Sequence, residues 1–332
     1  MATIKEVANS AGLSVTTVSR YLNNHPYISD EKRLKIEKAM ADLDYQPSAV
    51  AQQMRGVKAF HIGVLVSRIT NQYYAGLIDA LEVTARKFGY SILIIQNHNS
   101  EGEEKRALEL LKKKIIDGLV LCTVESDIDT LENYVKHGPI VLCNTHLYNT
   151  NIPSIHIDDE QATEEAINYL TGKGHKRIAY CTGGDFTSRS HGARRNKGFK
   201  TAMRKANQNI DYDLVFRHVH TLEDGEKIAS QLASMKNEQR PSAIFTGSDE
   251  VACGVINILT KSGINVPDDI AVMGFDNQKI SSLISVPVTT VHQPVDVLGK
   301  FTMEYLLAAI EGKSYVYDTG MLKTNMVIRN SA

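Results

Sequence analysis

The sequence predicts an all-α head of three short helices, followed by an α/β core of two doubly wound parallel-sheet lobes. Two observations lead to this fold class. Residues 1–45 combine helix-start signals with apolar residues at helical spacing. From residue 60 onward, short apolar runs alternate with helical patterns, which is typical of parallel sheets covered by helices. These runs are too many for one compact unit, so we expect two similar lobes.

Composition and length restrict the protein class. The 332 residues are enough for two or three domains, and the 42% hydrophobic and 23% charged fractions are ordinary for a globular protein. No run approaches the ~18 apolar residues of a membrane span. The N-terminal residues lack the apolar core of a secretory signal. The four cysteines are far apart and form no metal-binding motif, which indicates reduced, buried, cytoplasmic thiols.

The charge distribution is mildly asymmetric. The whole chain has 37 basic and 38 acidic residues, yet residues 1–58 carry a net charge of +2 and the remainder −3. This asymmetry permits nucleic-acid binding by the head but does not establish it.

The first two helices are marked by their caps. Thr3 and Glu6 have the spacing of a capping box, which starts the first helix. Gly12 supplies the backbone freedom that a tight turn needs. Ser14 is a good N-cap for a second helix that runs over residues 15–22.

The second helix has an inner and an outer face. Val18 and Leu22 are four residues apart, so they face the first helix. A small residue, a turn glycine and an inward β-branched residue at these spacings suit a helix-turn-helix, whose second helix enters the major groove of DNA. The same unit is also common as a structural corner, so a helical cap on the core is the alternative. The residues left on the outside are Val15, Thr16, Thr17 and Arg20.

A third helix and a short linker segment follow. Ser29 caps the third helix, in which Ile36, Ala39, Met40 and Leu43 repeat at helical spacing. Residues 48–54 are good helix formers after a proline, but so short a helix is marginal alone and must be ordered by something else. We therefore divide the chain into a head (1–46), a hinge helix and linker (47–58) and a core (59–332).

The core pattern is read as strands and helices in alternation. Apolar runs predict strands at 60–66, 91–96, 118–122, 140–143, 154–157, 177–182, 214–219, 243–246, 270–274 and 289–291. Helical patterns lie at 74–88, 103–114, 160–173, 249–262 and 295–311. We expect lobe one to comprise about 59–158 and 294–323, and lobe two about 159–293 and 324–332.

Polar or aromatic groups follow six of these strands. Ligands of open α/β sheets bind outside the carboxyl ends of strands, where Asn, Asp and Gln pair with hydroxyls and a tyrosine ring stacks on a sugar face. Each residue alone is equally a loop or cap residue, and Asp249 suits a helix cap. The six together predict a ligand site. They are Asn71 to Tyr74, Asn97 to Asn99, Asn144 to His146, Ser248-Asp249, Asp276-Asn277 and Gln293.

At this point a family resemblance becomes specific. The segments Thr3-Ile4-Lys5-Glu6-Val7-Ala8, Gly12-Leu13-Ser14-Val15-Thr16-Thr17-Val18-Ser19-Arg20 and Asn23 resemble the start of the lac repressor (LacI/GalR) family of bacterial regulators. Further matches are Tyr45-Gln46-Pro47-Ser48-Ala49-Val50-Ala51, Gly63-Val64, Asp117-Gly118-Leu119, Gly174-His175-Lys176-Arg177-Ile178-Ala179, Ser248-Asp249 and Gly274-Phe275-Asp276-Asn277. The resemblance implies a transcription regulator with a periplasmic-binding-protein-like core.

The resemblance places the DNA contacts. The family's base-reading positions fall on Val15 and Thr16, with Arg20 one turn on. Arg20 suits guanine O6 and N7, and equally a phosphate clamp. The family's minor-groove wedge leucine falls on Met54; methionine also serves as a wedge, or packs only against the partner hinge. The remaining predicted DNA-binding residues are Thr3, Ser14, Thr17, Asn23 and Ala51.

The resemblance also places the effector contacts. The family's effector-binding arginine falls on Arg195, with Arg194 as its competitor, and the effector-binding acid falls on Asp276. Ser248 stands where many relatives carry Asn. The predicted effector site comprises Asn71, Tyr73, Tyr74, Asn97, Asn144, Arg195, Ser248, Asp249, Asp276 and Gln293.

We therefore predict a homodimeric repressor of a carbohydrate-utilisation operon that binds a palindromic operator. A sugar or sugar phosphate between the lobes changes their relation and biases the hinge. Residues 324–332 leave no room for the C-terminal heptad helix of tetrameric members, so we expect a dimer. Whether the effector induces or co-represses stays open, as does a phosphocarrier co-repressor.

Two rival classes share the core pattern. A sugar-binding protein of a transport system has the same two-lobed fold, but residues 1–58 argue against it. An enzyme of the doubly wound class is the third possibility. No nucleotide-binding, nucleophile or metal-ligand motif is present in the sequence, so we expect neither an enzyme nor a cofactor or metal.

Overall fold

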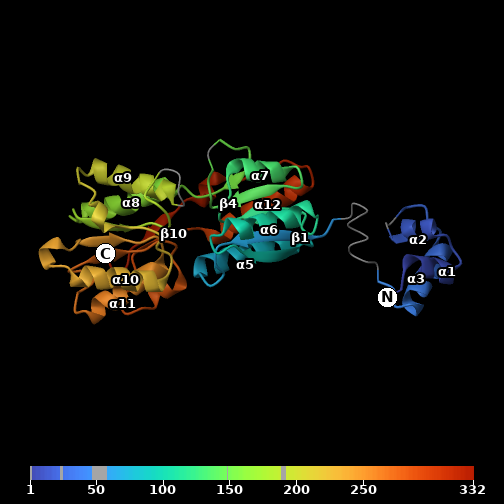
Figure 1. Cartoon of the computed structure of the whole chain (residues 1–332), viewed down its shortest axis with the longest axis horizontal. Helices are drawn as coiled ribbons and strands as arrows, with labels where there is room; N and C mark the ends of the chain where they lie inside the picture. The colour runs from blue at the N-terminus through green and yellow to red at the C-terminus, as the bar shows by residue number, and fades with distance from the viewer. Residues whose placement is uncertain (1, 23–24, 47–57, 148, 188–191) are drawn as a thin grey trace.

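The computed structural model describes every residue except 1, 23–24, 47–57, 148 and 188–191. Figure 1 shows a small helical head and two α/β lobes as separate units. The predicted fold class, a helix-turn-helix head on a core of two parallel-sheet lobes, is confirmed.

The head consists of α1 (Ile4–Ala11), α2 (Val15–Leu22) and α3 (Asp30–Asp42). The capping box forms: Thr3 Oγ1 accepts the Glu6 N–H, and the Glu6 carboxylate accepts the Thr3 N–H at 2.7 Å. Gly12 ends α1 with a left-handed φ of 65°, which starts the turn into α2. The buried core of the head is small and comprises Val7, Ala8, Val18, Ile36 and Ala39.

Two expectations for α3 need correction. Ser29 stands at the N-cap position, but its side chain makes no capping hydrogen bond. The predicted apolar stripe is also shorter than the spacing suggested, because Leu43 is the C-cap residue and is exposed. Ile36 and Ala39 alone are fully buried, and Met40 packs at the edge of the head core.

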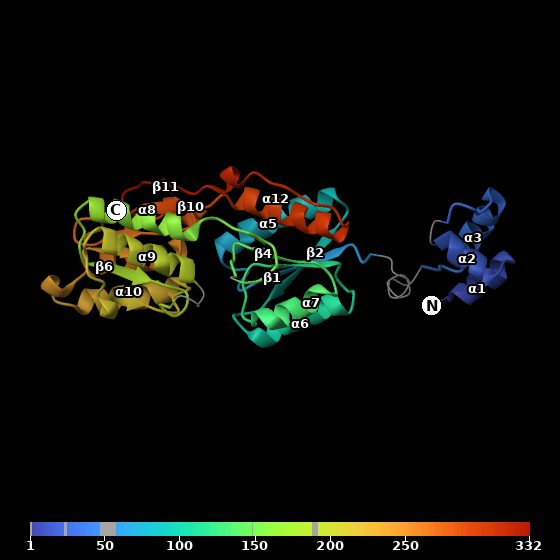
Figure 2. The same cartoon turned by 90° about the horizontal axis from the view of Figure 1, so that it is seen from above.

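Lobe one is a five-stranded parallel sheet in the order β2-β1-β3-β4-β5. Its strands are β1 (His61–Val66), β2 (Ser91–Gln96), β3 (Gly118–Leu121), β4 (Ile140–Cys143) and β5 (Ser154–Ile155). Alternate residues of β1 pack on opposite faces of the sheet. Val64 lies on the face that is covered by α5 (Gln72–Lys87) and α12 (Val295–Ile310). Leu65 lies on the other face, which is covered by α6 (Glu101–Lys112) and α7 (Ile128–Val135). Figure 2 shows these two helical layers on either side of the sheet.

Lobe two is a four-stranded parallel sheet in the order β7-β6-β8-β9. Its strands are β6 (Ile178–Cys181), β7 (Val215–Phe216), β8 (Ala243–Phe245) and β9 (Ala271–Met273). The helices are α8 (Asp159–Gly172) and α9 (Ala193–Lys205) on one face, and α10 (Leu222–Ser234) and α11 (Asp249–Lys261) on the other (Figure 1). Short 3-10 helices lie at Tyr212–Leu214, Asn237–Gln239, Lys279–Ser282 and Thr319–Leu322.

The end of the chain contributes to both lobes. After β10 (Thr290–His292), α12 packs against α5 in lobe one. The chain then returns as β11 (Asn325–Val327), which pairs antiparallel with β10. Ser331 completes the return, because the Val272 N–H in β9 donates to its carbonyl at 2.7 Å. Each lobe is thus assembled from segments far apart in the sequence.

The structure also bears on the cysteines, on membrane-spanning helices and on metal-binding groups. The four cysteines are buried and free, as the sequence indicated. Within the described residues, no helix has both the length and the apolar character needed to cross a bilayer. The same part of the chain holds no group of three or more His, Cys, Asp or Glu side chains suited to a metal ion.

Candidate functional site

The outer face of α2 carries the predicted DNA-reading residues. Val18 is fully buried, which turns the opposite face of the helix outward. Val15 is 40% exposed although it is apolar, and Thr16 and Arg20 are exposed beside it. Among the described residues, the Arg20 carbonyl accepts the His25 N–H at 3.0 Å, but its guanidinium makes no hydrogen bond or ion pair and is available to a ligand.

The other predicted DNA-binding residues of the head have local structural roles. Ser14 accepts the Thr17 N–H at 3.2 Å, and the two hydroxyls share a hydrogen bond of 2.9 Å. Thr3 belongs to the capping box of α1. These three side chains therefore fix the helix starts, which are the parts of a helix-turn-helix nearest to DNA. Asn23, Ala51 and Met54 lie outside the described residues.

A chain of side-chain hydrogen bonds connects the two lobes at their strand ends. In lobe one, Asn144 follows β4 with a left-handed φ of 54°. Its amide donates to the Tyr73 hydroxyl at 2.7 Å and to Gln293 Oε1 at 2.8 Å. Gln293 Nε2 in turn donates to Asp276 Oδ1 at 2.6 Å. Asp276 follows β9 in lobe two, so four residues predicted from separate strand ends are brought together.

The same chain of bonds extends to Asn71 through a residue that we did not predict. Gln278 Nε2 donates to Asp276 Oδ2 at 3.0 Å and to Asn71 Oδ1 at 3.3 Å. Asn71 also caps α5 by accepting the Tyr73 N–H at 2.8 Å. Gln278 is buried, and one clue to it in the sequence was its position two residues after Asp276. We call this set the interlobe network: Asn71, Tyr73, Asn144, Asp276, Gln278 and Gln293.

Arg195 lies beside the interlobe network in α9. Its Nε donates to Asp159 at 2.8 Å, its Nη1 donates to the Gly247 carbonyl at 2.9 Å, and its guanidinium lies 3.8 Å from the centre of the Phe275 ring. These contacts fix the guanidinium and pair its charge with a carboxylate. The neighbouring Arg194 instead pairs with Asp158 at 2.7 Å. Arg195 is also the arginine whose charge acts on Asp276, and its part in effector binding stays a prediction.

Two carboxyls of lobe two have raised pKa values. Burial raises the pKa of Asp276 to about 8, although Arg195 opposes this shift. Burial also raises the pKa of Asp249 to about 7. Asp249 accepts the Thr290 hydroxyl at 2.5 Å and the Gln278 N–H at 2.6 Å. One carboxylate oxygen thus holds the Thr290 side chain and the other holds the backbone at Gln278, and the helix cap is the neighbouring Ser248.

The remaining predicted residues lie at different distances from the interlobe network. Tyr74 stacks edge-on against Tyr73, with ring centroids 5.3 Å apart, and burial raises its pKa to about 12. Asn97 is buried and its Oδ1 accepts the Asn99 N–H at 3.1 Å. Within the described residues, no hydrogen bond joins Asn97 to the network. Its strand, β2, is the edge of the sheet, and β1 and β3 separate it from β4.

Two family models match the chain. The model of "Bacterial regulatory proteins, lacI family" matches residues 3–48. The model of "Periplasmic binding proteins and sugar binding domain of LacI family" matches residues 59–322. The first coincides with the helical head and the second with most of the two lobes.

Individual relatives resemble the chain over most or all of its length. The NTD biosynthesis operon regulator NtdR of Bacillus subtilis (strain 168) is 35% identical over 332 residues, which is all of both chains. A LacI family transcriptional regulator from Lactobacillus casei, solved with bound sucrose, is 38% identical with a TM-score of 0.78, over 82% of this chain and 99% of that one. The lac repressor dimer bound to operator and the anti-inducer ONPF is 26% identical with a TM-score of 0.77, over 99% of this chain and 98% of that one.

Proposed function

Since this chain belongs to the LacI family of bacterial regulatory proteins, we propose that it represses a carbohydrate-utilisation operon under the control of a sugar bound between its lobes. The family assignment makes it a DNA-binding transcription repressor with a sugar-binding domain, and its relatives are regulators rather than enzymes. The single observation that carries the sugar proposal is the interlobe network, which gathers hydroxyl-pairing groups from both lobes.

The chemistry of the interlobe network suits a polyhydroxylated ligand. A sugar hydroxyl both donates and accepts, so it can donate to Asp276 while it accepts from Asn144. Tyr73 and Tyr74 offer ring faces for the apolar side of a sugar ring. Because these groups bond to one another in the structure, a ligand must replace their hydrogen bonds with its own. Sugars can do so, since they carry many hydroxyls on a small frame.

The charges beside the network favour a neutral sugar over a sugar phosphate. Arg195 is the cation of the site, and its charge is already paired with Asp159. Asp276 adds a carboxyl whose ionised form is disfavoured by burial. A phosphate dianion would therefore lie near two carboxyl groups and one guanidinium whose charge Asp159 already neutralises. Its new contacts would not offset the free-energy cost of removing the phosphate from water. Among the described residues, this balance supports a neutral effector.

The DNA side of the proposal rests on α2 and the hinge. Val15, Thr16 and Arg20 would read base edges in the major groove of each operator half-site. By sequence resemblance, Met54 would act as the minor-groove wedge at the operator centre. Two heads require two copies of the chain, and the related lac repressor is a dimer when bound to operator. We therefore propose a homodimer on a palindromic operator.

A thermal-shift screen tests the effector class. The full-length protein is heated with neutral monosaccharides and disaccharides and with their phosphates. A ligand at 100 times its Kd adds ~2.7 kcal/mol to the free energy of unfolding. We expect a neutral sugar to stabilise the wild type but not Asp276→Ala, which lacks the carboxyl that pairs with a sugar hydroxyl. Stabilisation by phosphates alone would overturn the neutral-sugar proposal, and no stabilisation by any sugar would overturn the carbohydrate proposal.

A further inference from the structure

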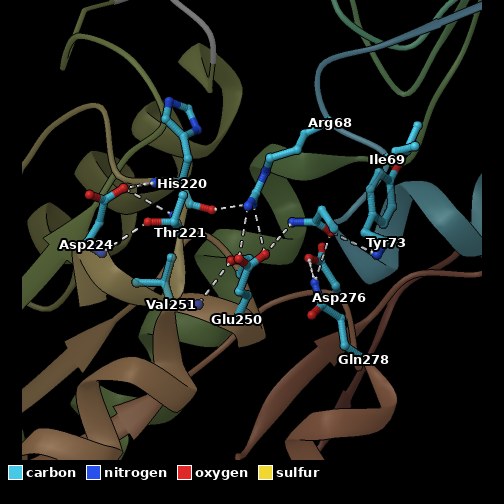
Figure 3. A network of polar contacts seen from close by, with 12 residues as sticks. Arg68, Ile69, Tyr73, His220, Thr221, Asp224, Glu250, Val251, Asp276 and Gln278 are labelled. Atoms are coloured by element: carbon cyan, nitrogen blue, oxygen red, sulfur yellow. Dashed lines mark hydrogen bonds and ion pairs between the residues drawn. The ribbon is translucent and has the colours of Figure 1, made fainter. Parts of the chain in front are cut away.

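The loop between β1 and α5 connects lobe one to lobe two through one arginine. The Arg68 guanidinium donates to both carboxylate oxygens of Glu250, Nη1 to Oε1 at 3.1 Å and Nη2 to Oε2 at 2.9 Å. Nη2 also donates to the His220 carbonyl at 2.9 Å. Figure 3 shows Arg68 reaching these two groups of the other lobe. A two-point guanidinium–carboxylate contact of this kind fixes orientation as well as distance.

The groups that receive Arg68 are held firmly in lobe two. Glu250 lies in the first turn of α11, where the helix dipole favours a carboxylate. The backbone at His220 is fixed because the His220 and Thr221 N–H groups both donate to Asp224 Oδ2 at 3.1 Å. The Arg68 and Glu250 side chains are 28% and 21% exposed, so solvent screens their attraction less than that of a fully exposed pair.

Asn71 joins this ion pair to the interlobe network. Its Nδ2 donates to Glu250 Oε2 at 3.0 Å, while its Oδ1 accepts from Gln278 at 3.3 Å. The next residue, Gln72, accepts the Ile280 N–H of lobe two at 3.4 Å. A short stretch of lobe one, residues 68–72, thus contacts three separate segments of lobe two.

We propose that Arg68, Asn71 and Glu250 form an interlobe latch, which holds the two lobes together through the chain's own contacts. The interlobe network takes Tyr73 and Asn144 from lobe one, and Asp276 and Gln293 from lobe two. These groups can meet one ligand only while the lobes are together, so the latch raises the fraction of molecules that are ready to bind. The latch also places Asn71 for Gln278, which makes Arg68 and Glu250 positioning residues for the network.

Hydrogen exchange tests the latch without any effector, so its result does not depend on the proposed sugar. The Ile280 amide is the reporter, because its hydrogen bond crosses between the lobes. In the full-length protein, Arg68→Ala and Glu250→Gln should each accelerate exchange at Ile280 by about five- to tenfold through more frequent lobe separation. The Ile244 amide in the centre of β8 should keep its wild-type rate, since lobe two stays folded.

Two further variants separate the latch from a general charge effect. Arg86→Ala removes an ion pair with Glu82 that lies wholly within α5, and it should leave exchange at Ile280 unchanged. Arg68→Lys keeps the positive charge beside Glu250 but loses the two-point contact, so its Ile280 rate should lie between those of the wild type and Arg68→Ala. Unchanged exchange at Ile280 in both latch variants would overturn the proposal. Equal acceleration at Ile280 and Ile244 would overturn it as well, because the pair would then support lobe stability rather than lobe contact.

Discussion

At the scale of single residues, Asp276 connects the chemistry of the site to stability. An unfolded chain ionises its aspartates near pH 4, whereas burial raises the pKa of Asp276 to about 8 in the folded protein. Between these values the folded state binds more protons than the unfolded state, so the free energy of unfolding falls as the pH rises. Asp249, with its pKa raised to about 7, acts in the same direction.

The first prediction follows from this fall of the free energy of unfolding as the pH rises. Asp276→Asn removes one of the two protonated carboxyls, so its melting temperature should fall less than that of the wild type between pH 5 and pH 8. Melting curves over this pH range make the comparison. Asp213→Asn, which changes an exposed carboxyl of the same lobe, should follow the wild type. An unchanged pH slope in Asp276→Asn would mean that Asp276 is already ionised in the folded protein.

Arg20 gives a second prediction at this scale. If it reads guanine, Arg20→Ala should weaken operator binding by ~1–3 kcal/mol per half-site. Binding to random DNA should change much less, and gel-shift titrations on both DNAs measure the difference. Lys35→Ala is a matched control in the head, because Lys35 is on α3 and pairs with Glu31 at 2.7 Å. Equal loss on both DNAs would make Arg20 a phosphate contact, and no loss would remove it from the interface.

The sequence identified the network residues that follow strand ends, and it missed one network residue and two latch residues that contact the other lobe. Tyr73, Asn144, Asp276 and Gln293 follow strand ends, and carboxyl ends of parallel strands share one edge. The same reasoning included Asn97. It predicts that a residue lies at the carboxyl edge of the sheet, but it does not predict which residues are adjacent along that edge. Arg68, Glu250 and Gln278 were missed because they find partners across the lobes, and no local pattern encodes that relation.

At the scale of elements, close helix packing in lobe two depends on glycine. The helices α10 and α11 approach each other so closely that a Cβ on Gly254 would lie 2.1 Å from the Leu222 carbonyl oxygen. A Cβ on Gly225 would lie 2.3 Å from the Val251 carbonyl oxygen. Both obstacles are backbone atoms, so the helices would have to move apart. This packing keeps the N-terminus of α11 beside α10. There the Glu250 carboxylate and the His220 carbonyl accept hydrogen bonds from Arg68.

The third prediction tests this packing. Gly254→Ala should lower the free energy of unfolding by ~1–3 kcal/mol, because overpacking outweighs the better helix propensity of alanine. Gly172→Ala is the matched control, since the new Cβ at the end of α8 meets open space. That variant should be neutral or stabilising by up to ~1 kcal/mol. Urea unfolding gives both values, and equal stability of the two variants would contradict the packing argument.

Elements with large apolar stripes were predictable, and elements with small or polar buried faces were not. The strands of both sheets and α5, α6, α8, α11 and α12 overlap the predicted segments. The helix α9 was missed because Asn196 and Gly198 occupy part of its buried face, so the apolar stripe is confined to Phe199, Ala202 and Met203 in its C-terminal half. The helices α7 and α10 and the strand β11 were missed as well. The predicted strand at 214–219 is shorter in the structure, because Tyr212–Leu214 forms a 3-10 helix.

At the scale of the whole molecule, regulation requires two ligands to bias one arrangement of lobes and heads. The interlobe network and the latch describe how an effector could favour the arrangement with the lobes together. An effector changes operator affinity only by as much as its own affinity differs between the two arrangements. The proposed dimer would place two heads at the spacing of a palindromic operator.

The most direct test of this account combines both ligands in one experiment. Operator DNA is first selected from a random pool by the wild-type protein, and its affinity is then measured with and without the sugar found in the thermal-shift screen. We predict that the sugar changes the wild-type affinity by about 5- to 150-fold, in either direction. Asp276→Ala should bind the operator as the wild type does and lose that response. A full response in Asp276→Ala would contradict the account, because the effector would then act at another site.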